Sequence, residues 1–74
     1  NPTTTVRYDV PRTGIVTVEL LSLKGERITV LADGNHAAGR YTLAIDGGRL
    51  ASGVYLCRMR AGSFSQSRKM TLIK

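Results

Sequence analysis

The sequence predicts an all-β fold, an antiparallel β-sandwich of six to seven short strands. Apolar and polar residues alternate in successive stretches along the chain, which is the period of two that a pleated strand imposes. Turn-forming residues separate these stretches at roughly ten-residue intervals, a spacing typical of sandwiches. No stretch shows the period of an amphipathic helix, so we expect no helix.

The expected strands follow one another with short turns between them. In the first strand Val6, Tyr8 and Val10 share a face, and in the third Leu31 breaks the alternation, which indicates a β-bulge. Residues 33–39 are rich in turn formers and hold no period, so we expect a surface loop there. We expect the strands at residues 3–10, 16–20, 27–32, 40–46, 50–60 and 64–73.

The stretch 50–60 has the most regular pattern and is expected to be a central strand. Arg58 and Arg60 fall on one of its faces, which therefore cannot be wholly buried, so the other face is expected to pack on the core. Tyr55 also fits a tyrosine corner, in which the hydroxyl bonds a nearby backbone group. The residues expected to face inward are Tyr55, Cys57 and Met59, with Phe64, Met70 and Leu72 in the next strand.

The length and charge of the chain limit its function. A chain of 74 residues forms one domain, whose core gives only about 3–5 kcal/mol of net stability and leaves little room for a buried active site. The formal charge of +6 is uneven, because residues 49–74 hold six basic residues and no acidic one. This half is expected to attract an anionic partner such as a phosphate-bearing lipid, a polysaccharide or an acidic protein surface, or to be a solvated face.

Patterns for catalysis and ligand binding are weak. His36 is the only histidine, and we expect it in a solvated loop while Cys57 lies in the core, which argues against a catalytic pair. Asp33, Asn35 and Asp46 lack the spacing of a calcium loop, and one cysteine with one histidine is too few for zinc. Inward tyrosines and the absence of a helix argue against sugar and nucleic-acid binding. We therefore expect no enzyme activity, metal, cofactor or nucleic-acid partner.

Short motifs along the chain carry a resemblance. They are Asn1-Pro2, Tyr8-Asp9-Val10-Pro11, Leu31-Ala32-Asp33-Gly34, Ala38-Gly39-Arg40-Tyr41, Leu50-Ala51-Ser52-Gly53-Val54-Tyr55 and Lys69-Met70-Thr71-Leu72-Ile73-Lys74. In this order they resemble the type A C-terminal sorting domain of type IX secretion, which is similar to the immunoglobulin-like module of the flagellar hook-capping protein. The resemblance implies an immunoglobulin-like β-sandwich.

The resemblance also implies a function. Residues 1–74 would form a single sorting domain at the end of a larger secreted protein. This non-catalytic signal would direct an upstream cargo domain from the periplasm through the type IX outer-membrane translocon, and a cell-surface sortase would then remove it. The residues that the resemblance assigns to translocon recognition are Gly39, Arg40, Tyr41, Gly53, Tyr55, Lys69, Met70 and Lys74. The alternatives are a structural immunoglobulin-like spacer or interaction domain of a secreted enzyme or extracellular assembly and, less favoured, a carbohydrate-binding module.

Overall fold

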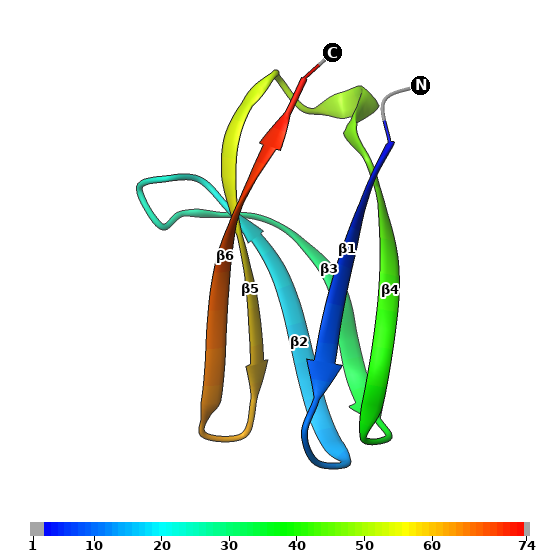
Figure 1. The fold of residues 1–74 in the computed structure, drawn as a ribbon. Helices are drawn as coiled ribbons and strands as arrows, with labels where there is room; N and C mark the ends of the chain where they lie inside the picture. Colours follow the sequence, from blue (N-terminus) through cyan, green and yellow to red (C-terminus); the bar gives the residue numbers. More distant parts are fainter. Residues whose placement is uncertain (1–2, 74) are drawn as a thin grey trace.

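The computed structural model describes residues 3–73, which form two packed antiparallel β-sheets (Figure 1). The strands are β1 (Thr3–Val10), β2 (Gly14–Leu21), β3 (Arg27–His36), β4 (Gly39–Asp46), β5 (Gly53–Ala61) and β6 (Phe64–Leu72). These positions confirm the predicted all-β sandwich and place every expected strand.

The six strands divide unequally between the sheets. β1 and β4 form a two-stranded sheet, and the other sheet has the strand order β3-β2-β5-β6. β5 therefore lies between two strands, which confirms its predicted central position, and β6 is an edge strand. β1 begins and β6 ends at the same end of the sandwich, the upper end in Figure 1.

The β2–β3 hairpin contains the predicted bulge. Val18 pairs with Ala32, but the next residue, Glu19, pairs with Val30, so Leu31 is an extra residue in β3. An extra residue bends its strand and increases the local twist. Leu31 is thereby packed against the core although it breaks the alternation.

The prediction of a surface loop at residues 33–39 was wrong for most of that range. β3 continues to His36, because residues 33–36 pair with residues 14–17 of β2, and β4 already begins at Gly39. Turn preference is a local property, whereas the ladder to β2 supplies hydrogen-bond partners from a distant part of the chain. The pairing outweighs the turn-forming composition of this segment.

A short 3₁₀ helix, η1 (Gly47–Arg49), follows β4, although the sequence predicted no helix. The Asp46 carboxylate accepts a hydrogen bond from the Gly48 N–H at 2.9 Å, and the Leu50 N–H donates to the Gly47 carbonyl at 3.1 Å. An acidic cap before two glycines is enough for one such turn. No helix in the described residues is long and apolar enough to cross a membrane.

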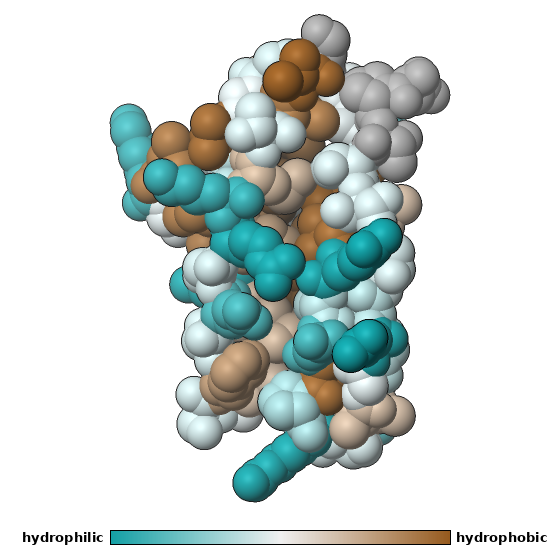
Figure 2. All heavy atoms as spheres, viewed as in Figure 1, coloured by the Kyte–Doolittle hydropathy of each residue, from teal (hydrophilic) through white to brown (hydrophobic). Residues whose placement is uncertain are grey.

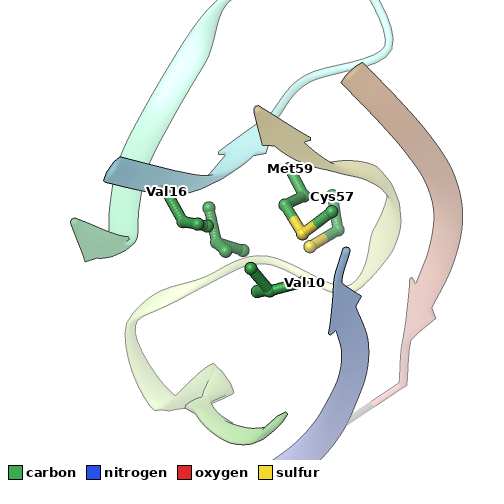
Figure 3. Packing of buried hydrophobic residues seen from close by; sticks show 5 residues of the cluster. Val10, Val16, Cys57 and Met59 are labelled. Carbon is green, nitrogen blue, oxygen red and sulfur yellow. The ribbon is translucent and has the colours of Figure 1, made fainter. Parts of the chain in front are cut away.

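The core lies between the two sheets and is built from strands of both. Val10 of β1 meets Val16 and Val18 of β2 and Cys57 and Met59 of β5 (Figure 3). Each of these side chains is at most 8% exposed. The predicted inward direction of Cys57 and Met59 is confirmed.

Three residues expected to face inward are less buried than predicted. Tyr55 and Met70 are half-buried, and Phe64 at the start of β6 is 43% exposed, whereas Leu72 at its end is 4% exposed. The two-stranded sheet is narrower than the four-stranded one, so part of the edge strand β6 has no layer to pack against. Alternation predicts the face on which a residue lies, but it does not predict whether another sheet covers that face.

Candidate functional site

The segment that leads into β4 holds three of the residues assigned to recognition. Gly39 opens the strand with a φ of +150°, a conformation that favours glycine. Tyr41 donates its hydroxyl hydrogen bond back to the Ala37 carbonyl, and its ring stacks on Tyr8 of β1 at a centroid distance of 5.4 Å. Gly39 and Tyr41 thus form the start of the strand and pack it onto its neighbour.

The segment that leads into β5 repeats this arrangement. Gly53 opens the strand, and the Tyr55 hydroxyl donates to the carbonyl oxygen of Ala51, four residues earlier in the chain. This contact confirms the predicted tyrosine-corner interaction. Both segments read Ala-x-Gly-x-Tyr, so the same spacing would have predicted the Tyr41 contact, which the sequence analysis missed.

His36 is part of an aromatic cluster and not of a solvated loop. Its Nε2 lies 3.1 Å from the Tyr8 hydroxyl, its Nδ1 lies 3.1 Å from the Gly34 carbonyl oxygen, and its ring meets Tyr41 edge-on at 4.8 Å. Burial, with smaller effects of Tyr41 and Cys57, raises the pKa of Tyr8. The cluster joins β3 of one sheet to β1 and β4 of the other, so its role is to hold the sheets together.

The charged residues assigned to recognition lie on opposite faces of the sandwich. Tyr41 and Met70 both pack against the core, so their neighbours Arg40 and Lys69 point outward from different sheets. The Arg40 side chain is 92% exposed and lies 4.0 Å from Asp9, which is a weak surface pair. Lys69 is exposed, and Lys74 lies outside the described residues. The structure therefore does not bring Arg40 and Lys69 into one site.

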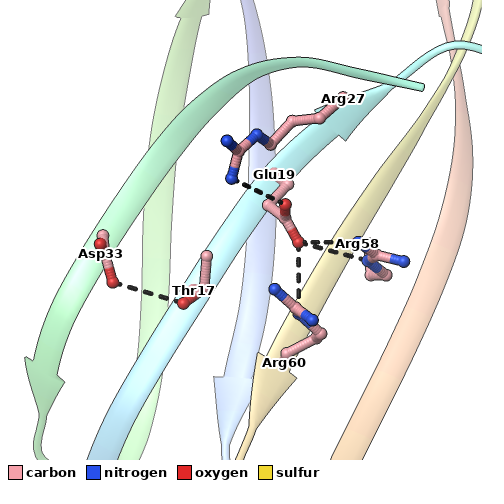
Figure 4. Close-up of polar contacts among 6 residues, drawn as sticks. All are labelled: Thr17, Glu19, Arg27, Asp33, Arg58 and Arg60. Atoms are coloured by element: carbon pink, nitrogen blue, oxygen red, sulfur yellow. Dashed lines mark hydrogen bonds and ion pairs between the residues drawn. The ribbon is translucent and has the colours of Figure 1, made fainter. Parts of the chain in front are cut away.

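A charged cluster that the sequence did not predict lies on the outer face of the four-stranded sheet (Figure 4). Glu19 of β2 is 2% exposed, and its carboxylate meets three guanidinium groups. Arg58 donates two hydrogen bonds to Oε1 of Glu19, from Nη2 at 3.0 Å and from Nε at 3.3 Å. The Nε of Arg60 lies 3.3 Å from the same oxygen. The Nη1 of Arg27 in β3 lies 3.7 Å from Oε2. We call these four residues the arginine cluster.

The arginine cluster changes the acidity of its carboxyl group. Desolvation by itself raises the pKa of Glu19, but the hydrogen bonds from Arg58 and the charges of Arg58, Arg60 and Arg27 outweigh it, so the pKa is lowered. Glu19 lies on an outer sheet face, and the three arginine side chains cover it. The alternation places Glu19, Arg58 and Arg60 outward, but only the register of β2 against β5 shows that they meet.

Cys57 is a free cysteine whose side chain lies in the core. Cys57 is 8% exposed, and burial raises the pKa of its thiol, with a smaller opposing effect of Arg68. The confirmed core position makes Cys57 a packing residue. Within residues 3–73, no group of three or more His, Cys, Asp or Glu side chains is placed to hold a metal ion.

Exposed apolar side chains lie at both ends of the sandwich. At the end where β6 stops, hydrophobic side chains gather at the surface, and Ile73 is 79% exposed (Figure 2). At the opposite end, Ile15 and Phe64 line an open hollow of about 560 Å³ between the β1–β2 and β5–β6 turns. Hydrophilic side chains cover the middle of the face shown in Figure 2.

Comparisons with known proteins give one result. The family model of the secretion system C-terminal sorting domain matches residues 1–74. A search of curated proteins and a search of solved structures found no match.

Proposed function

This chain belongs to the secretion system C-terminal sorting domain family, and on that premise we propose that its exposed basic residues contact the translocon while its motif tyrosines hold the sandwich in shape. The family carries the C-terminal sorting signal of type IX secretion, which marks proteins for export across the outer membrane to the cell surface or medium. The match over residues 1–74 is the observation that carries this function.

The geometry divides the assigned residues into two groups. Gly39 and Gly53 carry no side chain, and the Tyr41 and Tyr55 hydroxyls already donate to backbone carbonyls at the two strand starts. The half-buried Met70 packs on the core, so these five residues offer little to a partner. We expect their contribution to export to act through folding. A change in any of them should then reduce export and stability together.

The exposed charges are the better candidates for direct contact. Among the described residues, neither Arg40 nor Lys69 is held by a buried partner, so each can meet an acidic surface without first breaking the fold. Lys74 stays a predicted contact at the end of the same basic segment. Because Arg40 and Lys69 point from opposite faces, we propose that the translocon contacts the domain on both sides.

Removal by a sortase is a further part of the proposal. All of β1 pairs with β4, beginning with Thr3 opposite Asp46, so a cut inside β1 would remove part of the two-stranded sheet. A cut in the chain before Thr3 would leave both sheets intact. We therefore expect the sortase to cut before β1 and to release the domain folded, with no catalytic contribution from the domain itself.

A reporter fusion tests the export function. Residues 1–74 are joined to a fluorescent protein with an export signal, in a bacterium that has type IX secretion, and the reporter is located by fractionation. The parent fusion should reach the surface or the medium, whereas Arg40→Glu with Lys69→Glu should leave the reporter in the periplasm. The double variant should melt within a few degrees of the parent, since surface substitutions usually change stability by no more than about 0.5 kcal/mol.

Arg12→Glu with Lys24→Glu is the matched control, because it makes the same charge change in two exposed turns. Normal export of the control and loss of export in the test variant would support direct contact. Normal export of both would remove Arg40 and Lys69 from the mechanism. If the parent fusion itself stayed in the periplasm, the spacer alternative would become the better account. Mass spectrometry of the released fragment would locate the cut relative to Thr3.

A further inference from the structure

The arginine cluster has more positive charge than Glu19 can neutralise. Three guanidinium groups face one carboxylate, which leaves a surplus of two positive charges. The side chains of Arg27, Arg58 and Arg60 are 59%, 33% and 53% exposed, whereas Glu19 is 2% exposed. The negative charge therefore lies beneath the surface and the positive charges lie at it.

The guanidinium groups also keep unused donors. Each has five N–H donors. Arg60 reaches Glu19 through Nε, Arg58 through Nε and Nη2, and Arg27 through Nη1. Among the described residues, both terminal nitrogens of Arg60 and Nη1 of Arg58 make no side-chain hydrogen bond.

Glu19 limits the freedom of these side chains. A surface arginine ordinarily samples many rotamers and loses that freedom when it binds a ligand. Here Arg58 and Arg60 converge on one oxygen of a buried carboxylate, and Arg27 approaches the other (Figure 4). Much of the ordering is therefore complete before a ligand arrives.

The surroundings of the cluster add basic and polar groups. Ser67 of β6 pairs with Arg58, and Lys69 lies two residues further along the same outward face, opposite Leu56. Asp33, on the neighbouring strand β3, accepts a hydrogen bond from Thr17 at 3.3 Å, and Figure 4 shows it directed toward Thr17 and not toward the guanidinium groups.

We propose that the arginine cluster is a binding site for a phosphate monoester group. A phosphate monoester carries close to two negative charges at neutral pH, which matches the surplus of the cluster. Its oxygens accept the paired N–H bonds that a planar guanidinium offers. A single carboxylate would neutralise only half of the surplus, so one Asp or Glu side chain fits less well. This inference goes beyond the sorting function and does not depend on it.

The test is a titration of the 74-residue chain followed by the amide signals in NMR, at constant ionic strength and pH 7.5. The probes are inorganic phosphate and glucose 1-phosphate, with acetate for comparison. Saturable shifts at the signals of residues 19, 27, 58 and 60 with both phosphate probes, and weaker effects of acetate, would support the site. Shifts scattered over all basic residues without saturation would overturn it.

Substitutions separate a formed site from general attraction. Arg60→Gln and Arg60→Lys should both raise the Kd for glucose 1-phosphate at least about fivefold, because lysine keeps the charge but lacks the planar fork. Arg12→Gln, in an exposed turn, should change the Kd less than about twofold. Equal effects of Arg60→Gln and Arg12→Gln would overturn the proposal.

The Glu19→Gln variant best distinguishes the proposed site from a merely basic surface. It adds one positive charge to the net charge of the chain, so a merely basic surface would bind phosphate more tightly. In the proposed site the guanidinium groups lose their anchor, and the Kd should rise in spite of the added charge. Tighter binding by Glu19→Gln would overturn the proposal, and if this variant does not fold, the Arg60→Lys result decides.

The source of the phosphate group is tested separately. Vesicles of phosphatidylcholine with phosphatidic acid present the same group on a membrane, and sedimentation measures binding. Binding of glucose 1-phosphate supports a site for a soluble or saccharide-borne phosphate. Binding to vesicles without any binding of glucose 1-phosphate would overturn the proposed site in favour of general contact with a membrane surface. None of these assays involves export, so their failure would leave the sorting function standing.

Discussion

Tyr55 donates its hydroxyl hydrogen bond to the carbonyl oxygen of Ala51, four residues earlier and just before β5 begins. Tyr41 makes the same contact with Ala37 ahead of β4. Each contact fastens the segment before a strand to a side chain within that strand. Each sheet thus has one strand, β4 or β5, whose start is held by a tyrosine hydrogen bond of this kind.

Removing the Tyr55 hydroxyl should destabilise the domain moderately. Tyr55→Phe keeps the half-buried ring and deletes one hydrogen bond, which should lower the free energy of unfolding by about 0.5–1.5 kcal/mol. Urea denaturation followed by circular dichroism measures the change. Tyr41→Phe is the matched variant and should cost a similar amount, and no loss in either would mean that the hydroxyls do not secure the strand starts.

The arginine cluster should make stability depend on pH. The pKa of Glu19 is lowered by folding, so the stabilisation is fully present above the unfolded value of about 4.3 and is lost as the pH falls through the lower folded value. Glu19→Gln should cost about 1–3 kcal/mol at pH 6, where it removes hydrogen bonds to charged groups. Urea denaturation at pH 6 and pH 3 should show the difference between parent and variant shrinking at the lower pH. A difference that stays constant would contradict the role of the ionised carboxylate.

Loss of a core side chain should leave the domain with little or no net stability. Met59→Ala removes a residue that is 4% exposed, and such truncations cost about 2–5 kcal/mol. A domain of this size has only about 3–5 kcal/mol of net stability. The control, Ile15→Ala, removes a side chain that is 65% exposed and should change stability by no more than about 0.5 kcal/mol. Thermal unfolding curves of the two variants compare them directly.

The thiol of Cys57 should be unreactive in the folded domain. Burial raises its pKa, so the reactive thiolate is scarcer than usual at pH 8, and the side chain is only 8% exposed. A colorimetric disulfide reagent should modify Cys57 slowly without urea and rapidly in concentrated urea. Equally fast modification in both conditions would show that the core opens readily.

Local patterns in the sequence predict most of this fold. The alternation around Cys57 and Met59 indicates both the strand and its buried face, and Leu31, which breaks the alternation, marks one of the two register shifts between β2 and β3. Each of these signals depends on neighbours within one strand. For that reason the predictions made from these signals agree with the folded structure.

The features that the sequence did not predict depend on pairing between distant residues. His36 lies in a strand because β2 pairs with it, and Glu19 is buried because the register brings Arg58 and Arg60 over it. Phe64 is exposed because the opposite sheet is narrow. Alternation gives the face of each side chain, but the register and the width of the sheets determine what covers it.

The dimensions of the folded domain set a lower limit on the machinery that handles it. The principal extents are 35 × 25 × 16 Å, with the chain entering at β1 and β6 ending at the same end. If the sandwich passes the outer membrane folded, the passage must open to at least 25 × 16 Å in cross-section. A narrower passage would require the sandwich to unfold before transport. A cross-link that holds β1 to β4 would then block export, whereas export through a wide passage would be unchanged.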